Sequence, residues 1–276
     1  MADRNFREML EAQWEQGKFL CVGLDSDYEK LPEVVKGDSV RESIVAFNRS
    51  LVDATKAHVC AYKPNSAFYE AYGDQGVAAL RETISYIRDS APEVPVVLDA
   101  KRADIGNTNE GYAVAVFDHL RADAVTVHPY LGGEALSPFL QRKEKGIFIL
   151  CRTSNSGAGE FQDLEVQGTS LYKVVARRTM EAWNGNENCG VVVGATYPEE
   201  LREVRAIVGD MPILIPGVGV QGGDLIKTIH AGKDSCGRGM IICASRAVIF
   251  ASSGEDFAEA ARAQAQRLHE TIRSAL

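Results

Sequence analysis

Residues 94–108 have the sequence Val94-Pro-Val-Val-Leu-Asp-Ala-Lys-Arg-Ala-Asp-Ile-Gly-Asn-Thr108, in which an apolar run leads directly into a charged cluster. The run from Val94 to Leu98 is typical of a buried strand, and it stops on Asp99 and Lys101. Side chains two residues apart on a strand share a face, so we expect this carboxylate and this ammonium to point the same way. Asp104 follows where the strand has ended. Charges packed this closely shift one another's pKa, which is typical of functional sites, although a purely structural ion pair is the alternative.

Apolar runs of the same kind recur along the whole chain and alternate with helical patterns. The predicted strands are residues 19–24, 59–62, 94–98, 122–127, 146–150, 190–195, 212–215 and 240–244. The predicted helices are 3–16, 40–56, 75–90, 108–120, 134–144, 170–183, 198–208, a short one ending near 231, and 256–273. Strands that alternate with helices predict parallel βαβ units, and eight such units in about 250 residues match a (β/α)8 TIM barrel. We therefore expect an α/β fold, a single barrel domain over residues 1–276 with an additional N-terminal helix; a doubly wound open sheet is the alternative.

Polar residues follow nearly every predicted strand at its C-terminal end. In a barrel these ends meet at one face, where the active site lies. A single charged strand end means little, but a ring of them predicts a functional face. The residues in question are Asp25, Lys63, Asp99, Lys101, His128, Arg152 to Ser154, Thr196, Gln221 and Arg246.

Composition excludes several classes of protein. The net charge is −8 with acids and bases interspersed, which argues against a nucleic-acid-binding surface. No apolar stretch approaches the roughly 20 residues that span a bilayer, and the first residues lack the apolar core of a signal peptide. The six cysteines form no CxxC pair, so we expect buried thiols in a reducing cytoplasm rather than a metal site.

A glycine-rich segment follows the seventh predicted strand. Gly217-Val-Gly-Val-Gln-Gly222 matches G-x-G-x-x-G, but no acidic residue ends the next strand, so a dinucleotide site is poorly supported. Backbone N–H groups at Gly217 and Gly219 are better suited to a phosphate, which in this barrel binds after strands seven and eight. Arg246 would supply the opposite charge. The alternative is a glycine turn needed only for packing.

Residues 154–168 are polar and rich in glycine, and they follow the fifth predicted strand. Structureless loops of this length are usually functional or disordered. We predict a lid that closes over the substrate, with a solvated loop as the alternative.

The pattern Asp99-x-Lys101-x-x-Asp104-Ile105-x-x-Thr108 resembles the signature of the orotidine 5′-phosphate decarboxylase family. Related barrels use the DxKxxD core for other sugar phosphates, but here the resemblance covers nearly the whole chain. The segments Lys63-Pro-Asn65 and Arg152-Thr-Ser154 resemble the longer bacterial subgroup. Further matching blocks are Leu24-Asp25, Pro216-Gly-Val-Gly, Gln221-Gly-Gly and Ala244-Ser-Arg246.

This resemblance implies cofactor-free decarboxylation of orotidine 5′-monophosphate to UMP and CO2, in de novo pyrimidine biosynthesis. It implies that Lys101, Asp99 and Asp104 are catalytic and that no metal takes part. It also implies a homodimer in which Asp104 and Thr108 enter the neighbouring subunit's site. The remaining substrate contacts that it implies are Asp25 and Lys63 to the ribose, Ser154 to the pyrimidine, and Gln221 and Arg246 to the phosphate.

Three other functions remain as alternatives. A metal-dependent barrel acting on a sugar phosphate would need a carboxylate after the second strand, where this chain has Lys63-Pro-Asn65. A Schiff-base aldolase would use Lys63 or Lys101 as its nucleophile. A phosphate-ligand sensor would bind UMP without turnover, and it would leave the charged cluster without a purpose.

Overall fold

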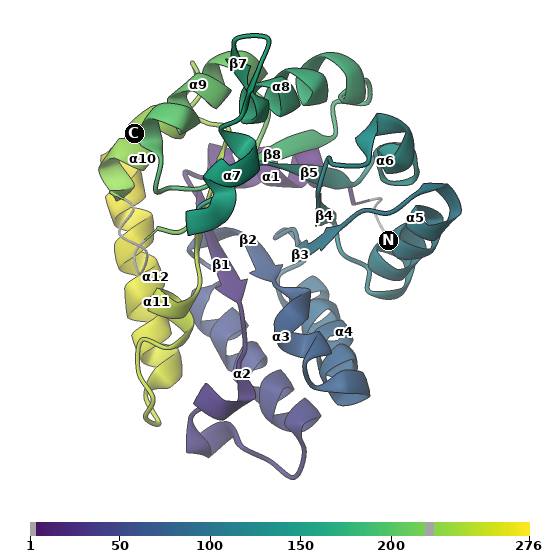
Figure 1. Cartoon of the computed structure of the whole chain (residues 1–276). Helices are drawn as coiled ribbons and strands as arrows, with labels where there is room; N and C mark the ends of the chain where they lie inside the picture. The colour runs from purple at the N-terminus through teal and green to yellow at the C-terminus, as the bar shows by residue number, and fades with distance from the viewer. Residues whose placement is uncertain (1–3, 219–223) are drawn as a thin grey trace.

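The computed structural model describes residues 4–218 and 224–276, and its centre is one eight-stranded parallel sheet (Figure 1). The order of its strands is β2-β1-β10-β9-β8-β5-β4-β3. Their bounds are β1 Leu20–Leu24, β2 Val59–Pro64, β3 Val97–Arg102, β4 Ala124–Val127, β5 Gly146–Arg152, β8 Cys189–Val193, β9 Ile213–Pro216 and β10 Met240–Ala244. All eight predicted strands are therefore present, and most are buried along their whole length because helices cover the outer face.

The two outer strands of this order, β2 and β3, meet and close the sheet. Parallel bridges join Tyr62 to Val96 and Asn65 to Asp99, and the Tyr62 N–H donates to the Pro95 carbonyl at 3.0 Å. The predicted (β/α)8 barrel is confirmed, and the open sheet is wrong because its two edges would lie apart. The third strand begins later than predicted, at Val97, because Pro95 has no N–H to donate to a ladder.

Helices surround the barrel in the predicted order. The main ones are α2 Val40–Thr55, α4 Gly73–Ser90, α5 Gly106–Ala113, α6 Gly132–Leu140, α8 Leu171–Arg178, α9 Pro198–Val208, α10 Leu225–Gly232 and α12 Phe257–Ser274, with short α11 at Arg246–Ile249. The sequence did not predict α3 Ser66–Glu70, which begins where the Asn65 side chain accepts a hydrogen bond from the Ala67 N–H, nor did it predict the short α11. In the described part of the chain, no helix is both long enough and apolar enough to cross a membrane.

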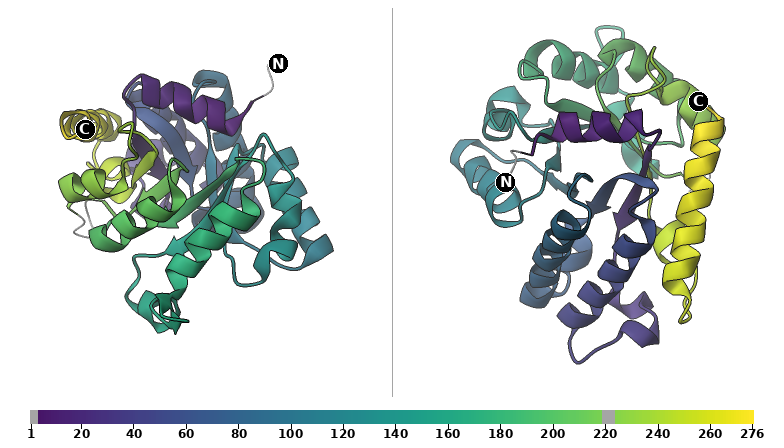
Figure 2. Two further views of the ribbon diagram at one scale, coloured as in Figure 1. Left: turned by 90° about the horizontal axis from the view of Figure 1, so that it is seen from above. Right: turned by 180° about the vertical axis from the view of Figure 1, so that it is seen from behind.

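The additional N-terminal helix, α1 Phe6–Glu15, lies across the end of the barrel where the strands begin (Figure 2, right). The Asn5 side chain caps it by accepting from the Arg7 and Glu8 N–H groups. Phe6 packs edge to face on Phe148, with ring centroids 5.6 Å apart. The helix thus fills this end of the barrel and leaves the opposite end for a site.

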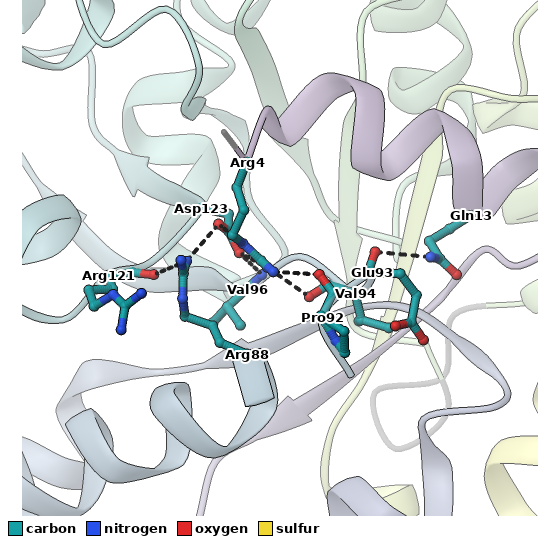
Figure 3. Close-up of polar contacts among 9 residues, drawn as sticks. All are labelled: Arg4, Gln13, Arg88, Pro92, Glu93, Val94, Val96, Arg121 and Asp123. Carbon is teal, nitrogen blue, oxygen red and sulfur yellow. Dashed lines mark hydrogen bonds and ion pairs between the residues drawn. The ribbon is translucent and has the colours of Figure 1, made fainter. Parts of the chain in front are cut away.

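A buried carboxylate ties the segment before α1 to the barrel (Figure 3). Asp123, just before β4, is fully buried and pairs with Arg4 at 2.7 Å and with Arg88 at 3.3 Å. It also accepts the Val96 N–H at 2.9 Å. One carboxylate therefore satisfies donors from three separate segments of the chain.

We expect Asp123→Ala to destabilise the fold by about 3–5 kcal/mol, because removing one partner leaves two arginines with uncompensated charge in a largely buried setting. Urea denaturation should show this loss. The matched control is Asp118→Ala, whose partly exposed carboxylate pairs with Arg142 at 2.8 Å and should contribute about 1 kcal/mol or less. Equal effects in the two variants would contradict a structural role for Asp123.

Candidate active site

A cavity of about 440 Å³ opens where the barrel strands end, opposite α1. Its size is typical of small-molecule sites. Most of the polar strand ends predicted to converge line this cavity, because parallel strands in a closed barrel finish at one face, whereas His128, Arg152 and Thr196 do not line it. Seven of the residues predicted to be catalytic or to bind the substrate line the cavity: Asp25, Lys63, Asp99, Lys101, Ser154, Gly217 and Arg246.

Four of these side chains form a chain of alternating charges across the cavity. Lys63 Nζ lies 2.9 Å from Asp99 Oδ2 and 4.0 Å from Asp25 Oδ1. Lys101 Nζ lies 2.7 Å from Asp99 Oδ1. The side chain of Lys63 is only 5% exposed, whereas that of Lys101 is 50% exposed. Lys63 is therefore a fixed internal counter-ion, and Lys101 presents its ammonium to whatever occupies the cavity.

This arrangement keeps the cluster ionised. Burial acts to raise the pKa of Asp99, but Lys63 and Lys101 outweigh burial and hold that pKa far below its usual range. Burial likewise acts to lower the pKa of Lys63, but the charges of Cys243, Asp99 and Asp25 raise it well above its usual value. At neutral pH, Asp99 is thus an anion and Lys63 a cation.

The backbone around Lys101 is unusual. Its φ is +47°, a conformation that non-glycine residues rarely adopt, and the pairing of β3 with β4 shifts register between Leu98 and Arg102. Thr126 on β4 holds this segment, since its Oγ1 accepts the Lys101 N–H at 3.0 Å and donates to Asp99 Oδ1 at 2.9 Å. Thr126 was not predicted as a site residue from the sequence. The available signal was a lone hydroxyl residue inside an apolar strand.

Asp25 is directed to the same space from the end of β1. Its Oδ1 atom is buried and accepts no hydrogen bond within residues 4–218 and 224–276. Buried acceptors are normally satisfied, so an unsatisfied carboxylate oxygen in a cavity is suited to a ligand hydroxyl.

Of the residues predicted to bind a phosphate, the structure describes Gly217 and Arg246. Gly217 has φ +97°, which only glycine adopts without strain, so its backbone bends at the mouth of the cavity. Arg246 begins α11 and is exposed, with no ion pair to any side chain that the structure describes. Gly219 and Gln221 lie outside the described residues.

Residues 154–168 contain more structure than predicted. They include a turn of 3₁₀ helix at Ser156–Ala158, the short helix α7 Gly159–Gln162, and part of a hairpin formed by β6 Glu165–Val166 and β7 Thr169–Ser170. Figure 1 shows α7 in front of the barrel strands, and Figure 2 (left) shows this segment and α1 at opposite ends of the barrel. The expectation of a structureless loop is therefore wrong, whereas closure over a substrate stays a prediction.

Arg152 at the end of β5 anchors this segment. Its guanidinium lies 4.1 Å from the centroid of the Tyr197 ring, and its Nε lies 3.1 Å from Asp163 Oδ1. Gln162 accepts the Thr153 N–H at 2.8 Å, so α7 is joined to the strand end beside Ser154. Tyr197, Asp163 and Gln162 lie about 10 to 45 residues from Arg152 in sequence. Only Arg152 to Ser154 were predicted from the sequence, as a polar strand end, so these contacts were not predicted.

Asp104 and Thr108 do not line the cavity of their own chain. Asp104 Oδ1 accepts the Ile105 N–H at 2.7 Å, and its own N–H donates to Asn109 at 2.8 Å. Thr108 is exposed on α5. Both residues were predicted to enter the neighbouring subunit's site, and this stays a prediction.

Comparison with known proteins identifies the family. A family model described as "Orotidine 5'-phosphate decarboxylase / HUMPS family" matches residues 18–263. This chain belongs to that family. The orotidine 5′-phosphate decarboxylase of Cellvibrio japonicus is 49% identical over 269 residues, covering 97% of this chain and 98% of the relative. That of Ralstonia nicotianae is 48% identical over 268 residues, covering 97% of each chain.

Solved structures of the same family have the same fold as this chain. The structure of Leishmania donovani OMP decarboxylase has a TM-score of 0.84 and 37% sequence identity to this chain, covering 99% of this chain and 100% of the other. The DxKxxD pattern, the similarity of the whole sequence and the fold thus all indicate the orotidine 5′-phosphate decarboxylase family. The sequence-based prediction of the family is confirmed, and the chain is a lyase of this family.

Proposed function

We propose that this chain decarboxylates orotidine 5′-monophosphate to UMP and CO2, the step that yields UMP in de novo pyrimidine biosynthesis. The observation that carries the proposal is the half-exposed Lys101 ammonium, held 2.7 Å from the ionised Asp99 at the edge of a nucleotide-sized cavity. The named relatives of the family support the same activity.

The charges fit the chemistry of the reaction. Cleavage of the bond between C6 and the carboxylate leaves an electron pair on C6 of the pyrimidine. Lys101 is positioned to stabilise this developing carbanion and then to protonate it from Nζ. Asp99 would lie near the departing carboxylate, where repulsion between the two anions is relieved as CO2 leaves.

The rest of the cavity would bind the nucleotide. The unsatisfied Asp25 oxygen and Lys63 would bind ribose hydroxyls, and Ser154, which also lines the cavity, would contact the pyrimidine edge. Gly217 and Arg246, with Gly219 and Gln221, would bind the phosphate. Binding energy from this remote phosphate can then serve to close residues 154–168 over the substrate. These residues would act without a cofactor or metal.

We also propose a homodimer in which Asp104 and Thr108 complete the neighbouring site. The surface beside them exposes apolar side chains on and around α5 and α6: Ile105 is 61% exposed and Tyr130 85% exposed. Exposed apolar side chains near Asp104 and Thr108 support a two-fold interface at this surface.

Two further proposals concern the whole chain. We propose that residues 1–276 act as one domain, since the barrel and α1 share a core. We also propose a cytoplasmic location, which the six free cysteines support because thiols persist in reducing compartments.

The test of function is an absorbance assay that follows loss of orotidine 5′-monophosphate with purified protein, with and without EDTA. We expect turnover that EDTA does not change. Turnover lost in EDTA would favour the metal-dependent alternative, and UMP binding without turnover would favour a sensor. Covalent trapping by borohydride in the presence of substrate would favour the aldolase.

Arg246→Ala should weaken transition-state stabilisation by about 2–5 kcal/mol, the usual result of removing one partner of a desolvated charge pair. The measurement is kcat/KM for orotidine 5′-monophosphate and for the nucleoside that lacks phosphate. Only the phosphorylated substrate should be affected. Arg238→Ala, at the opposite end of the barrel just before β10, is the matched control. If both substrates lose equally, Arg246 does not bind the phosphate.

A further inference from the structure

A pair of thiols lies beneath the charged cluster and has no part in the proposed reaction. Cys21 on β1 and Cys243 on β10 are direct neighbours in the parallel register of the two strands. Adjacent strands lie about 4.8 Å apart, so this register holds the pair in contact.

The surroundings of Cys243 differ from those of the other buried cysteines. Lys63, on β2 at the other side of β1, lines the same cavity and its charge acts on the Cys243 thiol. The hydrogen bond from Cys21 and the charge of Lys63 lower the pKa of Cys243 against the effect of burial. Burial instead raises the pKa of Cys151 and of Cys189 to about 12. A thiol next to an ammonium is reactive, whereas thiols in apolar surroundings are inert.

The Cys243 side chain can be reached only through the substrate cavity. Its exposed fraction is 3%, yet it lines the 440 Å³ cavity at whose edge Lys101 lies. Cys60 and Cys151 are equally buried and do not line this cavity. Cys236 is exposed and lies away from the cavity, before β10. Only a small reagent that fits the cavity can therefore reach Cys243, and a bound nucleotide would cover it.

We propose that Cys243 is a modification site on the floor of the substrate cavity, reactive toward small uncharged sulfur electrophiles, and that its modification blocks the substrate. With methyl methanethiosulfonate, the Cys243 thiolate attacks the divalent sulfur of the reagent. The new S–S bond forms as the S–S bond of the reagent breaks, and methanesulfinate leaves with the electron pair. The thiol proton passes to solvent, and the product is a methylthio group that extends into the cavity.

The experiment treats the full-length native protein briefly with methyl methanethiosulfonate and maps the adducts by peptide mass spectrometry. We expect adducts at Cys243 and at the exposed Cys236, while Cys60, Cys151 and Cys189 stay free. A Cys243 that stays unmodified when Cys236 is fully labelled would overturn the proposal, as would labelling of Cys243 only together with Cys60 and Cys151.

The claim that modification blocks the substrate rests on the proposed function, and activity measurements distinguish a failure of one from a failure of the other. Treated Cys236→Ser protein should lose activity as the unsubstituted protein does, whereas Cys243→Ser and Cys243→Ala should keep whatever activity each has untreated. UMP at about ten times its dissociation constant should slow labelling of Cys243 about tenfold, because about a tenth of the sites remain free. If Cys243 is labelled selectively but the protein neither turns over orotidine 5′-monophosphate nor binds UMP, the thiol site stands and the proposed function fails. Full activity with Cys243 fully modified would show that modification does not block the substrate.

Discussion

Lys101→Ala is expected to abolish turnover of orotidine 5′-monophosphate while the protein stays folded. A positioned general acid contributes about 10²- to 10⁴-fold to a rate, and a preorganised charge contributes about 10²- to 10³-fold. Since Lys101 would supply both effects at one atom, kcat should fall by at least about 10⁴-fold. The measurement is kcat by the absorbance assay at saturating substrate.

The fold should survive because Lys101 is half exposed and does not hold Asp99 alone. In the variant, Asp99 keeps its 2.9 Å contacts with Lys63 and with Thr126. Circular dichroism and the urea midpoint should therefore stay close to those of the unsubstituted protein. Lys56→Ala, which removes an exposed ammonium 2.9 Å from Asp53, is the matched control and should keep full activity. Activity of Lys101→Ala within about tenfold of the unsubstituted protein would exclude Lys101 as the proton donor.

Mixing two inactive variants, Lys101→Ala and Asp104→Ala, is expected to restore activity. If Asp104 acts across a two-fold interface, one site of the mixed dimer inherits both lesions. The other site receives Lys101 from one chain and Asp104 from its partner, and so it should work. Activity should approach half that of the unsubstituted dimer for each heterodimer formed.

The structure motivates this experiment through the position of Asp104. Its carboxylate lies outside the cavity of its own chain and caps the Ile105 N–H, whereas Asp99 already pairs with Lys101 within that chain. The control mixture combines Lys101→Ala with Asp99→Ala. Asp99 and Lys101 come from the same strand, so one chain of that mixed dimer contributes an altered Lys101 and the other an altered Asp99, and neither site is intact. If mass spectrometry detects Lys101→Ala/Asp104→Ala heterodimers without activity, Asp104 acts in the site of its own chain.

The sequence alone determined the barrel and the face that carries its site. Those features depend on local patterns: apolar runs of strand length, helical periodicity between them, and a polar residue after nearly every run. Asp99 and Lys101 could be predicted to meet because two residues on one strand share a face, and they lie 2.7 Å apart. The family resemblance came from the same short-range spacing.

Contacts between distant segments were decided only by the tertiary structure. Lys63 lies between Asp25 and Asp99 because β2 pairs with β1 on one side and closes against β3 on the other. Thr126 supports Lys101 through the shifted register of β3 and β4, which no local pattern encodes.

The same reason explains the other features that the sequence did not predict. Arg152 meets Tyr197 and Asp163 only once β5 and the segments around it have been positioned by the barrel. Cys21 and Cys243 lie more than 200 residues apart in sequence and become neighbours because β10 returns to pair with β1. Periodicity specifies which face of a strand is buried, but strand order and register specify which residues meet, and these arise only when the whole sheet closes.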